Sequence, residues 1–279
     1  MVIRAVLMVS AFVSIAITVG IFVALTRPVI GFFEEVPFGT FLSADAQYGV
    51  LPLIGGTLMT TAIALLVAVP LGLGAAMYLS EYASRRARKV LKPTVELLAG
   101  IPSVVYGFFA LTFVTPTLLQ DILALQVNFT NALSAGLVLG VMVIPTIASL
   151  AEDALSAVPQ SMRQGSLAMG ANRMQTTLRV VFPAALSGIG AAIVLGMSRA
   201  IGETMIVALA AGAQKNLSID PREGMQTMTG FIATTAQGEN PVGSTSYNTL
   251  FAVGMMLFLI TLVVNIVSIF LVRRFRQVY

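Results

Sequence analysis

Long apolar stretches alternate with short polar ones along the whole chain. Five uncharged stretches each exceed the roughly 20 residues with which a helix crosses a hydrocarbon core of about 30 Å. They cover residues 5–26, 46–80, 97–120, 122–151 and 240–272. A sixth stretch, 180–214, is equally apolar but contains Arg199 and Glu203. The pattern predicts an all-α integral membrane protein with six transmembrane helices.

The expected helices form a single transmembrane domain that takes up residues 1–279. A polar cytoplasmic connection, 151–182, separates the fourth helix from the fifth. The first apolar run is longer than the about 7–15 residues of a signal-peptide core, so we expect a retained signal-anchor helix. The expected helices have approximate bounds 4–26, 53–80, 94–118, 131–150, 183–212 and 247–272.

The basic residues favour one side of the membrane. Twelve of the 16 lysines and arginines lie near the two ends or in the connections 81–93 and 151–182. Short cytoplasmic loops are enriched in Lys and Arg, so we expect these connections and both ends of the chain in the cytoplasm. The twelve are Arg4, Arg85, Arg86, Arg88, Lys89, Lys92, Arg163, Arg173, Arg179, Arg273, Arg274 and Arg276.

The composition of the chain mainly excludes classes of site and function. Charged residues make up 10% of the chain, far below the roughly one quarter of a soluble domain. The chain has no cysteine and no histidine, so we expect no disulfide, no metal site and no histidine-based catalysis. No lysine follows a glycine, as an ATP-binding P-loop requires. Orientation explains the basic loops, so we expect no nucleic-acid partner.

Small residues recur four positions apart within the expected helices. Such spacing lets helix backbones approach closely in lipid, where packing drives association. We therefore expect these positions at helix–helix contacts. The pairs are Gly136 with Gly140, Ala184 with Gly188, and Ala192 with Gly196.

The connection 151–182 is too polar to span a membrane and too patterned for a plain linker. Residues 161–170 form an amphipathic run, which Gly170 is expected to end, and Pro183 suits the first turn of the next helix. Such a surface helix either docks on a cytoplasmic partner or lies on the bilayer. The residues alone leave these two interpretations open.

Arg199 and Glu203 are four apart, so we expect them on one helix face, close enough to pair. Arg199 lies 16 residues past Pro183, roughly 24 Å along a helix, which places it near the membrane midplane. An ionisable group at that depth favours a functional site over a structural ion pair. The planar guanidinium fork of arginine suits an oxyanion.

The expected third helix contains a second group of polar candidates. Pro102 is expected to kink the helix and to free a backbone carbonyl. Ser103 and Tyr106 are three apart on one face. They line a pore or are hydroxyls satisfied within the helix bundle, and both interpretations stay open.

The spacing in the connection 151–182 resembles the coupling loop of ABC importer permeases. That loop reads Glu-Ala-Ala, three residues, Gly, nine residues, then Ile-x-Leu-Pro. Here Gln164, Gly165 and Ser166 stand for the first three residues, and Gly170 and Pro183 match the glycine and the proline. The spacing is kept, whereas Gln164 replaces the glutamate.

Four further segments, with the stretch 226–229 and the overall spacing, resemble permeases of the bacterial phosphate importer, and its PstC subunit more than its PstA subunit. The resemblance covers about residue 45 to the end. It places the family's Arg-Ala-x-Gly-Glu-Thr segment on Arg199, Glu203 and Thr204. The four segments are Val-Pro-Leu-Gly-Leu-Gly at 69–74, Tyr-Leu-Ser-Glu-Tyr at 78–82, Ala-Gly-Ile-Pro-Ser-Val-Val-Tyr-Gly at 99–107 and Ser-Arg-Ala-Ile-Gly-Glu-Thr at 198–204.

The resemblance implies the type I ABC importer permease fold in the bacterial plasma membrane. It also implies a PstA-like sister permease, two PstB-like ATPases that hold ATP and magnesium, and a PstS-like phosphate-binding protein. The substrate pathway would include Arg199, Glu203, Thr204, Ser103 and Tyr106. Coupling to the ATPases would use Gln164, Gly165, Ser166, Gly170, Arg173 and Pro183.

Two alternatives remain from the sequence. One is a permease of the same architecture for sulfate or molybdate. The other is a secondary transporter without ATPases, a class that commonly shows internal repeats or several acidic residues within the membrane.

Overall fold

A computed structural model describes residues 2–45 and 47–274. These described residues are helical over most of their length and contain no strand. The α-helices are α1 (Val2–Glu35), α2 (Phe38–Phe41), α3 (Leu51–Met77), α4 (Arg85–Ala99), α5 (Ser103–Phe109), α6 (Ala132–Ser156), α7 (Gln160–Ala168), α8 (Arg173–Thr176), α9 (Phe182–Ala184), α10 (Leu186–Ile201), α11 (Met205–Ala210), α12 (Met228–Gln237) and α13 (Thr245–Arg274). Three π-helical segments are η1 (Tyr78–Tyr82), η2 (Ala110–Ile122) and η3 (Thr177–Val181).

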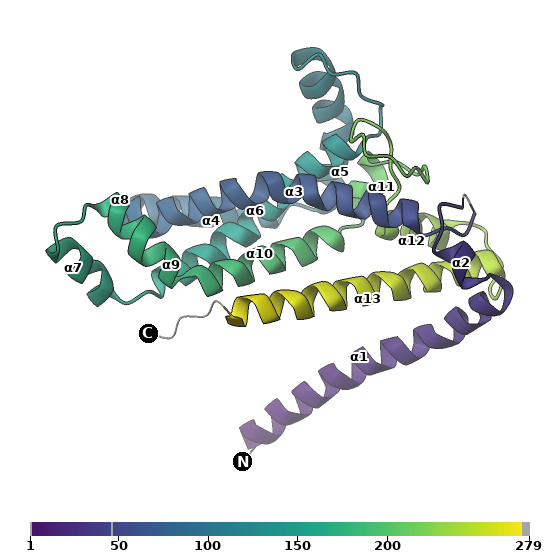
Figure 1. Cartoon of the computed structure of the whole chain (residues 1–279), viewed down its shortest axis with the longest axis horizontal. Helices are drawn as coiled ribbons and strands as arrows, with labels where there is room; N and C mark the ends of the chain where they lie inside the picture. Colours follow the sequence, from purple (N-terminus) through teal and green to yellow (C-terminus); the bar gives the residue numbers. More distant parts are fainter. Residues whose placement is uncertain (1, 46, 275–279) are drawn as a thin grey trace.

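The centre of the fold is the α3–α6 pair, whose helices lie side by side, with α10 packed against α6 (Figure 1). Helix α13 runs beside α10, and α1 contacts α13 but diverges from it toward its N-terminal end (Figure 1). Helix α5 and η2 project out of this layer. Among the described residues, five helices are long and apolar enough to span a membrane. A bent pair of helices, 173–184 and 186–201, makes a sixth span if it is counted as one.

Glycines allow the central helices to approach closely, as the small-residue spacing predicted. A Cβ on Gly136 would lie 2.6 Å from the Cβ of Ile63, and one on Gly140 would lie 2.9 Å from the Ala64 carbonyl oxygen. Where α10 packs against α6, a Cβ on Gly196 of α10 would lie 2.7 Å from Ile147. Only glycine fits at these separations, so the three-helix centre depends on them.

Two of the six expected helices are broken. Instead of one helix over 94–118, α4 ends at Ala99 and α5 begins at Ser103. Pro102 precedes α5 as its N-cap residue rather than kinking a continuous helix. The missing N–H and fixed φ of proline suit a helix start, and they break the ladder before it.

The expected helix 183–212 is also interrupted, at both of its ends. The segment through Ala184 and the helix from Leu186 meet at a bend of 70°. After Ile201, the chain leaves the helix for three residues and re-enters one at Met205.

Helix α1 continues nine residues past the expected end at residue 26, through Pro28 to Glu35. The extension buries Phe32 completely. The Phe32 ring packs edge-on against Phe41 at 5.5 Å and against Tyr48 at 6.0 Å between centroids. This aromatic contact, which hydropathy does not record, stabilises the extra turns.

One end of the helix layer gathers most of the basic residues. The connections between α3 and α4 and between α6 and α10 both lie there, with α7 and α8 (Figure 1). The N-terminal end of α1 and the C-terminal end of α13 point toward the same end (Figure 1). This arrangement agrees with the expectation that the basic connections and both ends of the chain lie on one side of the membrane. Arg276 lies outside the described residues.

Candidate functional site

The break between α10 and α11 brings together polar groups from three helices. Arg199 lies in the last turn of α10, where its Nη1 donates a hydrogen bond to Thr146 Oγ1 of α6 at 2.7 Å. Arg199 is an exposed residue in this chain, and no second hydrogen bond of its guanidinium is found within the described residues. Arg199 is therefore held at one nitrogen and keeps further donors available to an anion.

Glu203 does not share a helix face with Arg199, which corrects the expectation from the sequence. Helix α10 ends at Ile201, and the salt bridges among the described residues include no bond between the two side chains. Instead, Glu203 Oε1 accepts hydrogen bonds from the backbone N–H groups of Met205 at 3.0 Å and Ile206 at 3.3 Å. Unpaired N–H groups at a helix start are the nearer donors for a carboxylate.

Helix α12 stabilises this break from the other side. Thr229 Oγ1 donates to the Glu203 backbone carbonyl at 2.6 Å. Thr204 precedes α11 and donates its hydroxyl to the Gly202 carbonyl at 3.3 Å. The threonines thus satisfy carbonyl groups that an unbroken helix would have bonded itself. The break is a built feature, and it separates Arg199 from Glu203.

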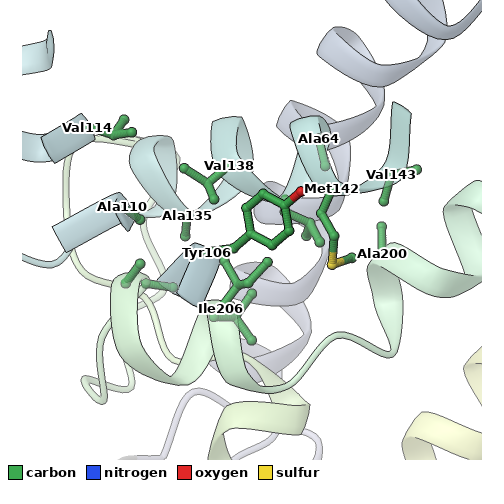
Figure 2. Close-up of a cluster of buried hydrophobic side chains, with 14 of the residues drawn as sticks. Ala64, Tyr106, Ala110, Val114, Ala135, Val138, Met142, Val143, Ala200 and Ile206 are labelled. Atoms are coloured by element: carbon green, nitrogen blue, oxygen red, sulfur yellow. The ribbon is translucent and has the colours of Figure 1, made fainter. Parts of the chain in front are cut away.

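The candidates in α5 have different surroundings. Tyr106 is buried in the core between α3, α5, α6 and α11, with Ala135, Met142 and Ile206 among its neighbours (Figure 2). Its hydroxyl donates to the Leu98 carbonyl at 2.9 Å, and this carbonyl also accepts the Ile101 N–H at 3.4 Å because Pro102 has no N–H to offer it. The structure places Tyr106 in the packing of the break, while Ser103 is half-buried at the start of α5.

The connection between α6 and α10 contains the short helix α7, which Gly170 ends. Gly170 has φ +84°, a conformation that favours glycine. Its N–H donates to Leu167 O at 3.0 Å, and the Ala171 N–H donates to Ser166 O at 3.2 Å. These two bonds form a Schellman motif, so the predicted role of Gly170 as a helix stop is confirmed.

The predicted coupling residues lie on the α7–α8 turn and just after it. Gln164 and Gly165 are exposed, whereas the Ser166 hydroxyl lies 2.9 Å from that of Thr176. Arg173 begins α8, and its guanidinium carbon lies 5.6 Å from the centroid of the Tyr82 ring. Pro183 lies near the end of the helical segment 173–184, just before the bend to α10, rather than, as expected, in the first turn of the helix that follows the connection.

Sequence reasoning missed the ion pair that ties α7 to the end of α3. Arg163 Nη2 donates to Glu81 Oε1 at 2.9 Å and to the Leu155 carbonyl at 2.7 Å, and Nη1 bonds the Val158 carbonyl. The Arg163 and Glu81 side chains are 11% and 8% exposed. The sequence feature that could have revealed this pair is Glu81, a single carboxylate directly after a long uncharged stretch. A charge that is buried there needs a partner of opposite charge.

The family of the chain follows from comparisons with known proteins. The family model for the binding-protein-dependent transport system inner membrane component matches residues 68–277. The chain belongs to this family. It is 38% identical over 275 residues to the probable ABC transporter permease protein YqgH of Bacillus subtilis, covering 96% of this chain and 86% of that one. It is 40% identical over 250 residues to the phosphate transport system permease protein PstC 1 of Mycobacterium tuberculosis, covering 82% and 73% of the two chains.

Solved permease structures share the fold of this family member. A chain of a bacterial alginate ABC transporter superposes with a TM-score of 0.71 at 16% identity, covering 99% of this chain and 95% of that one. A chain of the MetNI methionine ABC transporter gives 0.60 at 20% identity, covering 82% and 95%. The fold prediction is confirmed, and the chain is a multi-pass permease of the plasma membrane.

Proposed function

We propose that this chain is a transmembrane subunit of an ATP-driven importer that moves inorganic phosphate into the cytoplasm. The observation that carries the proposal is the 40% identity to a phosphate transport permease over 82% of the chain. The exposed guanidinium of Arg199 at a helix break supports it, since such a fork binds tetrahedral oxyanions.

The importer would contain a PstA-like sister permease, two PstB-like ATPases and a PstS-like phosphate-binding protein. The ATPases would hold ATP and magnesium, and ATP supplies the free energy of transport through them. In this chain, the exposed surface of α7 is the proposed docking site, with Gln164, Gly165 and Met169 at its surface.

Movement of a docked ATPase would reach the membrane helices through buried contacts. The Arg163–Glu81 ion pair joins α7 to the end of α3, and the Ser166–Thr176 contact joins α7 to α8. Helix α3 packs along α6, and Thr146 of α6 bonds Arg199. A shift of α7 would therefore move α3 and α6 together, and with them the hydrogen-bond partner of Arg199. The helices would then switch access to the break from one side of the membrane to the other.

The break would distinguish phosphate from sulfate through Glu203. Its Oε1 is occupied by the α11 backbone, while no hydrogen bond within the described residues reaches Oε2. A free carboxylate oxygen accepts a hydrogen bond from the hydroxyl of phosphate and repels sulfate, which has no proton near neutral pH. Arg199 would bind the anion and Glu203 would select the protonated one.

The test is anion-stimulated ATP hydrolysis by the reconstituted importer with phosphate, sulfate or molybdate. We expect phosphate alone to stimulate hydrolysis. In a system without the binding protein, Glu203→Gln should lower the stimulation of ATP hydrolysis by phosphate. It should also reduce the difference between the stimulation by phosphate and that by sulfate. Stimulation by sulfate or molybdate instead of phosphate would contradict the substrate, and an unchanged difference in Glu203→Gln would reject the selecting role.

A further inference from the structure

Helix α4 carries charged and apolar residues in separate parts, and several of its apolar residues have little cover in this chain. None of its residues, all of which the structure describes, is buried. Val90 and Leu97 are 65% and 73% exposed. Five cations occupy its first eight residues, Arg85 to Lys92, a rise of about 10 Å at 1.5 Å per residue.

Two of these cations are bonded to α6. Glu152 of α6 is fully buried and accepts hydrogen bonds from Arg88 and, at 2.6 Å, from Lys92 Nζ. Lys92 also bonds Asp153 at 3.0 Å. The buried carboxylate therefore fixes the basic face of α4 against α6 and holds both side chains in place.

A shallow, open surface cavity of about 480 Å³ runs along this face, and α4 supplies all of its lining residues. Within the part of the chain that the structure describes, Arg85 and Lys89 make no side-chain hydrogen bond or ion pair. They offer donors to a ligand beside the fixed Arg88 and Lys92. The cavity is lined by Arg85, Arg88, Lys89, Lys92, Pro93 and Glu96.

The charges around the cavity favour a monoanion. The lining contributes four positive charges and the negative charge of Glu96. Glu152 and Asp153, which bond Arg88 and Lys92 from α6, add two more negative charges, so the net charge is +1. A phosphodiester carries one negative charge, whereas a terminal phosphate group carries about 1.5–2 near neutral pH. The Glu96 carboxylate also accepts hydrogen bonds from hydroxyl groups of a ligand.

We propose that this cavity binds the headgroup of an anionic phospholipid of the cytoplasmic leaflet, a phosphodiester with hydroxyl groups. Arg85 and Lys89 hold the phosphate oxygens, and Glu96 accepts from a headgroup hydroxyl. The charged turns of α4 lie toward the end of the helix layer that gathers the basic residues (Figure 1), where anionic headgroups are expected, and the exposed Leu97 lies five residues beyond Lys92, about 7.5 Å along the helix. The site is separate from the proposed transport pathway.

Binding is measured by native mass spectrometry of the full chain in detergent, titrated with phosphatidylglycerol, phosphatidylcholine or inorganic phosphate. The variant Arg85→Gln/Lys89→Gln removes the free cations and leaves the Glu152 contacts. The control Arg86→Gln/Arg179→Gln removes the same charge from two exposed arginines that do not line the cavity.

We expect phosphatidylglycerol to bind the wild type and to lose about thirtyfold in affinity in the first variant, with little loss in the control. Phosphatidylcholine and inorganic phosphate should neither bind nor compete. An equal loss of phosphatidylglycerol affinity in both variants would show that the lipid is attracted by the overall positive charge and not by this cavity, and would overturn the site. Competition by inorganic phosphate would overturn the lipid as ligand, and loss of lipid on assembly with a sister permease would assign the cavity to that subunit.

Discussion

At the scale of single residues, Arg199 is the centre of the proposed pathway because it is a charge in an apolar stretch and has only one hydrogen-bond partner within the described residues. Arg199→Lys keeps the charge but loses the fork, so we expect transport to fall about tenfold or more through one lost charge-assisted bond. Assembly of the importer should be unaffected. The measurement is phosphate uptake at equal amounts of assembled complex, and uptake near the wild-type level would make Arg199 structural.

Gly140 shows how one hydrogen atom in place of a methyl group sets a helix separation. Gly140→Ala places a Cβ 2.9 Å from the Ala64 carbonyl oxygen, which cannot move without moving α3. We expect a loss of about 1–3 kcal/mol in the free energy of unfolding. Gly74→Ala is the control, because a Cβ there meets nothing within 4 Å.

Thermal unfolding of both variants in the same detergent is the measurement. The control should be neutral or more stable, since alanine favours a helix by about 0.5–1 kcal/mol over glycine. Equal stability of Gly140→Ala and Gly74→Ala would contradict the close α3–α6 contact.

At the scale of elements, the Arg163–Glu81 ion pair links the proposed docking helix to the membrane helices. Glu81→Gln leaves Arg163 its two carbonyl partners but removes the charge that opposes it. We expect a loss of about 1.5–3 kcal/mol in stability and fewer phosphate ions moved per ATP hydrolysed. The uptake-to-hydrolysis ratio is measured, with Glu239→Gln as a control on an exposed glutamate in the α12–α13 connection. A ratio equal to that of the control would mean that the pair does not transmit movement.

Hydropathy predicted which segments are helices but not where they break. Helices α3, α6 and α13 begin within two residues of their expected starts, because lipid demands long apolar runs. The break at Pro102 follows from the proline itself, whereas the break at Gly202 is stabilised by a contact between helices, from Thr229 to the Glu203 carbonyl.

The candidate site could be predicted only in part from the sequence, because contacts between helices contribute to its geometry. Arg199 and Glu203 are recognisable as charges in an apolar stretch, but a helical spacing placed them on one face. The bond of Arg199 to Thr146 depends on a helix far away in the sequence, whereas the bonds of Glu203 to the start of α11 follow from the local break in the helix. Gly170 acts locally through its positive φ, and its role as a helix stop followed directly from the sequence.

At the scale of the whole molecule, the orientation follows from the basic end of the helix layer. An Arg86→Cys variant should resist an impermeant thiol reagent in intact cells, whereas Val242→Cys, 85% exposed in the α12–α13 connection, should react. The chain has no cysteine, so background labelling from this chain is absent. After permeabilisation both positions should react. Labelling at position 86 from outside would invert the topology.

The most direct test of the central claim is uptake of labelled phosphate by proteoliposomes that contain the assembled importer. The ATPases face the lumen, where ATP is enclosed, and the binding protein is added outside. The account predicts phosphate accumulation that requires ATP, requires this chain and does not occur with sulfate. Phosphate entry that is equally fast without ATP would contradict it and would instead indicate a secondary transporter.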